Sequence, residues 1–181
     1  MTKTPTTGSA TTQEPQLWAV LTGHRDGPAL RVEHAFGTTA EDLWQAVTDP
    51  ERVSRWMAPT VLDGPAAVGA RYRIDFGDDG ASGGVVTRCE APSSYEVTWE
   101  LEGEPASVVL VAVEAVAHGA VLRLEHTRLP ANQVHGHAAG WQAHLAALAA
   151  LLEGGTTPDW DALFGTLLPA YRTRYPDVGA R

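Results

Sequence analysis

The sequence predicts an α+β fold in which a curved antiparallel β-sheet wraps around a long C-terminal helix. Between residues 68 and 127, apolar side chains recur at every second position, which is the period of half-buried strands. The run from Gln133 to Leu152 then has helical periodicity, and a helix of about 20 residues is roughly 30 Å long. A helix of that length needs a curved sheet to lie in, and such an arrangement often leaves a cavity between the two.

Composition narrows the class of protein. Hydrophobic residues make up 44 % of the 181 residues and charged residues 19 %, as in globular domains. The net charge of −9 argues against nucleic-acid or anionic-membrane partners. There is no apolar run long enough for a membrane span, no signal-peptide pattern, and a single cysteine, Cys89. We therefore expect a soluble, cytoplasmic protein.

The N-terminal region predicts a tail and a hairpin. Residues 1–15 are rich in Thr, Ser and Pro, so we expect them to be disordered. Leu17–Leu21 could form a short strand, and Leu30–Phe36 alternates as the next one. The turn signal Asp26-Gly27 between them predicts a β-hairpin.

Two short helices in tandem should follow. Thr39 can cap the first, with Glu41 and Asp42 in its first turn, and its apolar stripe is Leu43, Trp44 and Val47. Asp49-Pro50 supplies a cap and a first-turn proline for the second helix, whose buried residues would be Val53, Trp56 and Met57. Trp44 and Trp56 are assigned to packing.

The middle of the chain predicts strands joined by short turns. The expected strands are Val68–Phe76, Gly84–Glu90, Tyr95–Glu100, Ser107–Ala115 and Ala120–Thr127. Short connections between consecutive strands imply an antiparallel meander.

Two helices should end the chain. Asn132 is the expected cap of the long helix and Gly154-Gly155 its stop. Thr157-Pro158-Asp159 opens the last helix, and Pro169 should kink or split it. The apolar side of this last helix would be Trp160, Leu163, Phe164, Leu167 and Tyr171.

Several stretches, in this order along the chain, carry a resemblance to a known superfamily. They are Leu43-Trp44 through Asp49-Pro50 to Trp56, Gly84–Val86, Ala91-Pro92 before Tyr95–Trp99, Gly119 before Leu122–His126 with Leu129, and His137–Trp141 with Leu145 and Leu148. Over about residues 30 to 152 the chain resembles the SRPBCC superfamily (START/Bet v 1-like, helix-grip), and within it the group related to the C-terminal domain of the activator of Hsp90 ATPase.

The resemblance implies a helix-grip domain over residues 16–153, with residues 154–181 as a helical extension. Relatives in this superfamily include lipid and hormone binders, polyketide cyclases and aromatase-like enzymes. The first hypothesis is therefore the binding of a small apolar or amphipathic ligand between the long helix and the sheet. The alternatives are an enzyme of the polyketide cyclase/hydrolase-like type using the same cavity, or an Hsp90-activator-like interaction module.

Strand parity predicts the cavity wall. Residues Val32, Phe36, Tyr72, Ile74, Phe76, Val97, Trp99, Leu122 and Leu124 would point inward, and His34 and His126 share their faces. A buried polar group without a partner costs about 1–3 kcal/mol, so each histidine either orients a ligand, acts as a base, or bonds to a backbone carbonyl, Tyr72 or a buried water. The expected ligand-binding residues are His34, Tyr72, Phe76, Trp99, His126, Trp141 and Leu145.

Other chemistry is expected to be absent. His135, His137 and His144 on the long helix lack the partners of a recognised zinc spacing, so a solvent-facing or capping role is predicted. Cys89 is predicted to be a buried structural thiol. We expect no metal and no cofactor, and no motif supports a homodimer, although the sequence is compatible with one.

Overall fold

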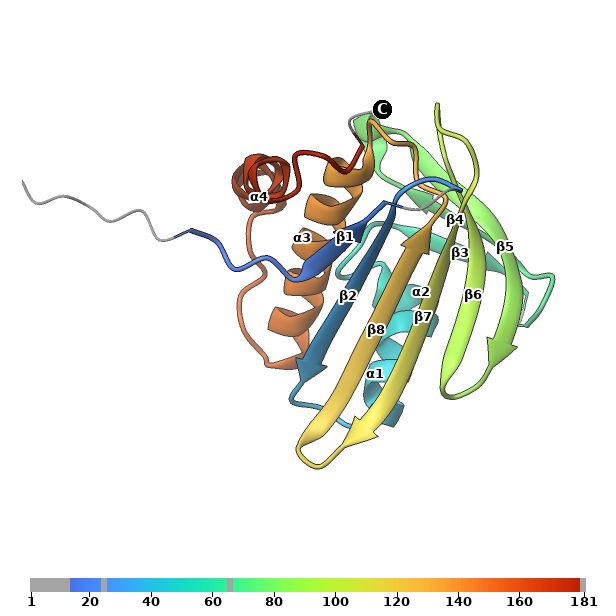
Figure 1. Ribbon diagram of the computed structural model, residues 1–181. Helices are drawn as coiled ribbons and strands as arrows, with labels where there is room; N and C mark the ends of the chain where they lie inside the picture. The colour runs from blue at the N-terminus through green and yellow to red at the C-terminus, as the bar shows by residue number, and fades with distance from the viewer. Residues whose placement is uncertain (1–13, 24–25, 65–66, 180–181) are drawn as a thin grey trace, which may run out of the picture.

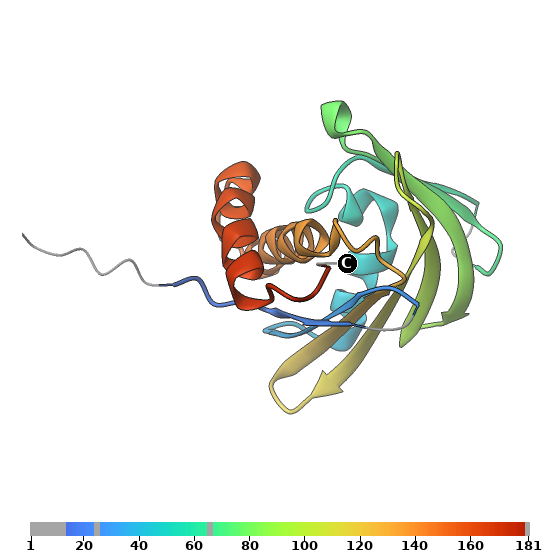
Figure 2. The same ribbon diagram turned by 45° about the horizontal axis from the view of Figure 1, so that its top comes forward.

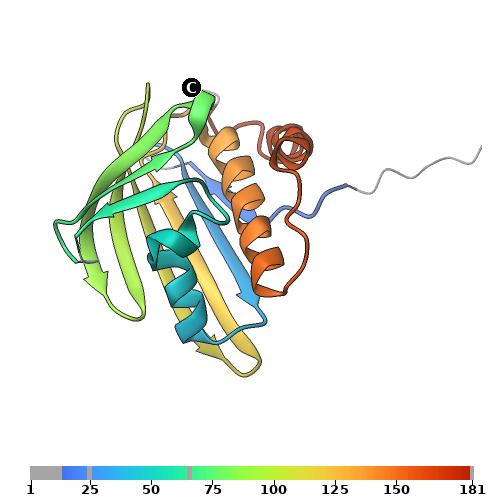
Figure 3. The same ribbon diagram turned by 180° about the vertical axis from the view of Figure 1, so that it is seen from behind.

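The computed structural model describes residues 14–23, 26–64 and 67–179. In these residues eight strands form one curved antiparallel sheet, and the helices α1, α2 and α3 lie on its concave face (Figures 1 to 3). The strands are β1 Ala19–Thr22, β2 Ala29–Phe36, β3 Thr60–Asp63, β4 Arg71–Asp75, β5 Ala81–Glu90, β6 Ser94–Leu101, β7 Ser107–Val116 and β8 Gly119–Thr127. The helices are α1 Ala40–Thr48, α2 Pro50–Val53, α3 Val134–Leu152 and α4 Trp160–Arg174, with a short 3₁₀ turn η1 at Gly77–Asp79.

The predicted α+β fold, the β1–β2 hairpin and the antiparallel meander from β4 to β8 are confirmed. The strand order is β1-β2-β8-β7-β6-β5-β4-β3, so the hairpin pairs with the last strand of the meander. Val32 lies opposite Leu124 and His34 opposite Leu122 in this pairing. The two short helices connect β2, which is next to one edge of the sheet, to β3, which forms the opposite edge.

Strand β3 was not predicted. It is a four-residue edge strand with no fully buried residue, so it has little of the alternation by which strands are recognised. The strand expected from Val68 instead begins at Arg71, because Gly69 adopts a φ of +92° and interrupts the extended backbone.

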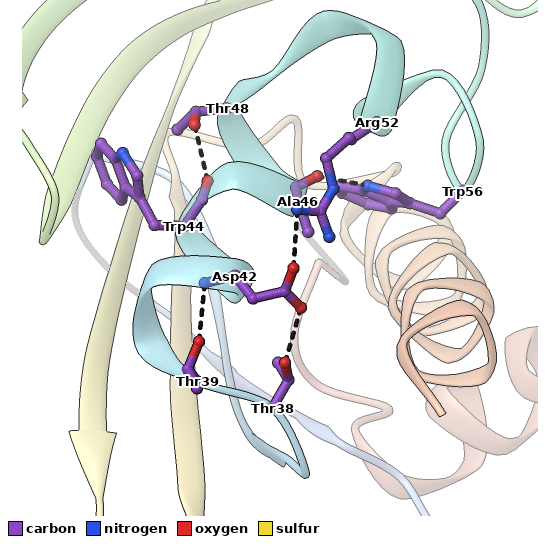
Figure 4. A network of polar contacts seen from close by, with 8 residues as sticks. All are labelled: Thr38, Thr39, Asp42, Trp44, Ala46, Thr48, Arg52 and Trp56. Atoms are coloured by element: carbon purple, nitrogen blue, oxygen red, sulfur yellow. Dashed lines mark hydrogen bonds and ion pairs between the residues drawn. The ribbon is translucent and has the colours of Figure 1, made fainter. Parts of the chain in front are cut away.

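Hydrogen bonds and an ion pair from side chains stabilise the helical pair, α1 and α2 (Figure 4). Thr39 caps α1 by accepting a bond from the backbone N–H of Asp42 at 3.1 Å, as predicted. The Asp42 carboxylate pairs with Arg52 of α2 at 2.9 Å. Trp56, just beyond α2, donates its indole N–H to the carbonyl of Ala46 in α1 at 3.0 Å. These contacts join α1 to α2 and fix the orientation of the Trp56 indole.

Two helix predictions need correction. Gln133, not Asn132, precedes α3 as the cap residue, and it forms no side-chain capping bond. Helix α4 begins after Thr157-Pro158-Asp159, as predicted, and Asp159 caps it. It runs through Pro169 as one helix, so of the predicted kink or split the split is absent. Pro169 and Gly165, whose carbonyl loses its intrahelical partner, are both exposed, so water can satisfy that carbonyl. Helix α4 packs against α3 (Figure 2).

Of the predicted disordered tail, residues 1–13 lie outside the described residues. None of the described helices is long and apolar enough to cross a membrane.

A buried polar cluster ties the N-terminal segment and α4 to α3. The hydroxyl of the fully buried Tyr171 donates to Gln142 Oε1 at 2.6 Å and accepts from the backbone N–H of Ala19 at 2.8 Å. Gln142 Oε1 also accepts from the N–H of Trp18, and Gln142 Nε2 donates to the carbonyl of Gln16. The C-terminal helix is therefore part of the packed structure.

Replacing Tyr171 with phenylalanine is expected to lower the free energy of unfolding by about 1–3 kcal/mol, because the buried N–H of Ala19 loses its acceptor. Urea unfolding measures the change. Tyr175→Phe is the control, since that hydroxyl makes only a 3.4 Å contact with the Ala19 carbonyl. Equal losses in both variants would contradict the role given to Tyr171.

Candidate functional site

A cavity of about 180 Å³, here called the inner cavity, lies between α3, the helical pair and the sheet. Its wall is predominantly apolar and combines both layers of the fold. The helical side is lined by Trp44, Val47, Val53, Trp56, Trp141 and Leu145, and the sheet side includes Tyr72, Ile74, Val97, Trp99, Val109, Val111, Leu122 and Leu124. The concave sheet face, α3 and the helical pair together border this apolar space.

A larger space of about 1210 Å³, here called the outer groove, opens between α3, the start of α4 and the loops that follow α2 and β4. Trp99 of β6 and Trp141 of α3 line both spaces, with ring centroids 5.2 Å apart. Trp56 and Met57 also border both. The two tryptophan rings therefore form part of the wall that separates the inner cavity from the outer groove.

His126 of β8 is fully buried next to the Trp141 ring of that wall and lines neither space. Its Nδ1 accepts a hydrogen bond from the indole N–H of Trp141 at 3.0 Å, so Nδ1 carries no proton. Its Nε2 lies 2.7 Å from Ser107 Oγ, which in turn donates to the carbonyl of Trp99 at 3.2 Å. The consistent assignment is a neutral ring with the proton on Nε2, donating to Ser107.

Burial holds the pKa of His126 well below its usual value, and the nearby His137 lowers it further. Both ring nitrogens bond to protein groups, and His126 lines neither space. Of the alternatives that the sequence left open, this structure contains the one in which the histidine bonds to its protein neighbours. The expected carbonyl, Tyr72 or water is replaced by Ser107 and Trp141.

His34 is on the concave face, as strand parity predicts, but away from both spaces. Its ring stacks on Trp18 with centroids 3.8 Å apart and meets the edge of Phe36 at 4.9 Å. Burial lowers its pKa, and Glu153 at the end of α3 partly opposes that shift. The segment before β1 covers this part of the sheet, so the structure does not bring His34 together with the other predicted site residues.

The remaining predicted residues divide between the two spaces. Tyr72 and Leu145 line the inner cavity, and the Tyr72 hydroxyl donates to the carbonyl of Thr98 at 2.7 Å. Phe76 lines the outer groove only. Its backbone has left the extended conformation, because β4 ends at Asp75. Trp99 and Trp141 face both spaces.

His137 and His144 were predicted to face solvent or to cap the helix, and this was wrong. His137 Nε2 lies 2.7 Å from a Glu104 carboxylate oxygen, with only 9 % of the His137 side chain exposed. His144 is held at Nδ1, 3.3 Å from the carbonyl of Trp56, and burial lowers its pKa to about 4. Both line the outer groove. Their seven-residue spacing around Trp141 was the available signal, but the segments that cover this face come from distant parts of the chain.

These histidines do not complete a metal site. In the described part of the chain, no three His, Cys, Asp or Glu side chains are grouped so that they could hold a metal ion. Cys89 is only partly buried, on β5, where it borders the inner cavity.

Comparison with known proteins identifies the family. The sequence model of the "Activator of Hsp90 ATPase homolog 1-like protein" family (AHSA1) matches residues 37–153. The chain belongs to this family. The match confirms the resemblance found in the sequence, and it runs from the end of β2 to the end of α3. No curated protein sequence matches this AHSA1-like chain.

Solved structures share the fold of the AHSA1-like chain. CalU16 from Micromonospora echinospora is 21 % identical, with a TM-score of 0.71 over 87 % of this chain and 96 % of that one. DynU16, from the dynemicin biosynthetic locus, is 29 % identical, with a TM-score of 0.63 over 71 % and 48 %. The Aha1 dimer from Colwellia psychrerythraea is 17 % identical, with a TM-score of 0.62 over 71 % and 98 %. These likenesses support the helix-grip fold.

Proposed function

We propose that this AHSA1-like protein binds a small apolar or amphipathic molecule in the inner cavity. The observation that carries the proposal is an apolar space of about 180 Å³ between α3 and the sheet. An apolar cavity offers water few hydrogen-bond partners, so apolar molecules occupy it more favourably than water does. Folds with such a space between a helix and a sheet commonly bind ligands there.

The size of the inner cavity limits the ligand. Cavities of about 150 Å³ accept a benzene-sized molecule, whereas drug-sized ligands need roughly 300–1,000 Å³. The inner cavity does not extend further because Trp99 and Trp141 close it on the groove side. The proposed ligand is therefore a single ring or a short branched chain.

One feature supports an amphipathic ligand over a purely apolar one. The indole N–H of Trp99 is buried and has no hydrogen-bond partner in the described residues, so an acceptor atom on the ligand could bond to it. His126 in turn orients Trp141 from behind through the 3.0 Å bond to its indole nitrogen. In this proposal Trp99, Trp141, Tyr72 and Leu145 contact the ligand, and His126 positions the wall.

The two alternative functions receive less support. An enzyme using the inner cavity needs two titratable groups in hydrogen-bond reach of each other there, and the pair formed by His137 and Glu104 lies on the outer groove instead.

For the interaction module, the relevant feature is exposed apolar surface. In the described part of the chain, the exposed large apolar side chains come from five different segments: Val20, Val61, Val68, Val116 and Leu151. The proposal of a homodimer rests only on the likeness to the Aha1 dimer. The origin of DynU16 in a biosynthetic locus is compatible with a small-molecule ligand.

Filling the inner cavity is expected to weaken ligand binding at least tenfold. The substitution is Val111→Phe, because Val111 is buried and lines the cavity. Thermal unfolding with a panel of benzene, toluene, phenol and short branched alcohols detects binding, since a ligand at 100 times its Kd stabilises the fold by about 2.7 kcal/mol. Native mass spectrometry of the freshly purified protein shows any co-purified ligand.

The matched control is Val113→Phe. Val113 is also buried on β7 and points to the same face, but it does not line the cavity. It should cost similar stability through overpacking while leaving affinity unchanged. The proposal fails if no member of the panel raises the melting temperature, or if both variants bind equally well.

A further inference from the structure

The outer groove has aromatic walls on several sides. Its aromatic lining residues are Trp56, Phe76, Trp99, Trp141, Trp160 and Phe164. At the start of α4, Trp160 stacks on Phe164 with centroids 4.8 Å apart and an interplanar angle of 12°. The indole N–H of Trp160 is buried without a hydrogen-bond partner in the described residues. Aromatic walls favour a planar aromatic occupant, because rings gain from stacked and edge-on contacts.

His144 presents a hydrogen-bond acceptor in this groove. Its Nδ1 lies 3.3 Å from the Trp56 carbonyl, which can only accept, so Nδ1 carries the proton. A pKa of about 4, caused by burial, keeps the ring neutral near pH 7 and leaves Nε2 with a lone pair. No described residue bonds to Nε2, and the rings of Trp160 and Phe76 lie 5.5 Å and 6.0 Å from the His144 ring. A backbone carbonyl bond of this kind is what fixes a histidine with its other nitrogen ready for a ligand.

The charges around the groove disfavour an anion. Its charged lining residues are Arg55 and three acids, Asp75, Glu104 and Asp161. Glu104 is bonded to His137, but the balance stays acidic, as it is for the whole chain at −9. An acidic rim repels anionic groups, so an anionic occupant is disfavoured and a hydroxyl on the occupant should be un-ionised.

We propose that the outer groove is a second binding site, separate from the inner cavity, for a neutral planar aromatic molecule with a hydroxyl group that donates to His144 Nε2. The ring system contacts Trp160, Phe76 and Trp141, which line the groove. With a volume of about 1210 Å³, the groove takes molecules of two or more rings, which the inner cavity excludes.

The test compares 2-naphthol with 2-methoxynaphthalene, which keeps the rings and the oxygen but cannot donate. Fluorescence titration at pH 7.5 should show that the wild-type protein binds 2-naphthol about tenfold more tightly, since a hydrogen bond to a buried acceptor is worth about that factor. In His144→Phe, which keeps a ring of similar shape, the two affinities should become equal. His135→Phe is the matched control, because His135 is also on α3 but bonds the Tyr175 carbonyl outside the groove.

Two further measurements separate this site from the inner cavity and from loss of folding. Val111→Phe should leave 2-naphthol binding unchanged, whereas a loss would place the ligand in the inner cavity and overturn the proposal. In ¹⁵N spectra of the wild-type protein, 2-naphthol should shift the His144 Nε2 resonance and 2-methoxynaphthalene should not, which needs no variant. Failure of the wild type to bind either probe, equal affinity for both, or a preference that survives in His144→Phe also overturns it.

Discussion

Replacing His126 with alanine is expected to lower the free energy of unfolding by about 3–5 kcal/mol. The substitution leaves a cavity in a fully buried region and removes the one acceptor that the described residues offer to the Trp141 indole N–H. Ser107 loses one partner but keeps the Trp99 carbonyl. The loss should exceed that of an ordinary buried hydrogen bond, because an unpaired donor and lost packing add together.

His34→Ala is the control, since His34 is also on the concave face but makes only ring contacts with Trp18 and Phe36. We expect a loss of about 1 kcal/mol there. Urea unfolding of both variants at pH 7.5 gives the comparison. A loss in His126→Ala no larger than in His34→Ala would mean that the bonds of His126 to Trp141 and Ser107 contribute little.

Lowering the pH from 7 to 5 is expected to cost the wild-type protein roughly 3–4 kcal/mol of its free energy of unfolding. Burial keeps the pKa of His126 well below its usual value and lowers that of His144 to about 4. In the unfolded chain both titrate near 6.5, so the unfolded state binds more protons as the pH falls below that value. Each histidine then removes up to about 1.4 kcal/mol per pH unit, and the stability is complete only above pH 6.5.

Urea unfolding at pH 7, 6 and 5 measures this slope. The carboxylate of Asp42, whose pKa is lowered mainly by its bond from Thr38 and then by Arg52, contributes only near and below pH 3.8, outside this range. In His144→Phe the slope should fall by somewhat less than half, because His126 and, to a smaller extent, His34 still titrate with pKa values that burial lowers. Stability that is flat between pH 7 and 5 would contradict the buried, neutral state of both histidines.

Local patterns identified most of the elements. The helix caps Thr39 and Asp49 were found because each acts through a backbone N–H two or three residues ahead. The inward faces of β2, β6 and β8 followed from two-residue alternation. Strand β3 was not predicted, because its extended conformation depends on pairing with β4 and its four residues have no clear pattern of their own.

The site was less predictable. Parity correctly put His34 and His126 on the concave face, but only packing decided that Trp18 covers one and Trp141 bonds to the other. His144 was assigned to solvent because nothing near it in sequence shows that Trp56 and Trp160 would enclose it.

The sequence by itself determined the family, the α+β architecture and the apolar character of the space between α3 and the sheet, because these depend on periodicity and on short-range caps. Only the tertiary structure decided that Trp99 and Trp141 divide this space into an inner cavity and an outer groove, and which histidine nitrogens are occupied. Hydrogen bonds and side-chain volumes between residues far apart in the chain set those features, and no local pattern records them.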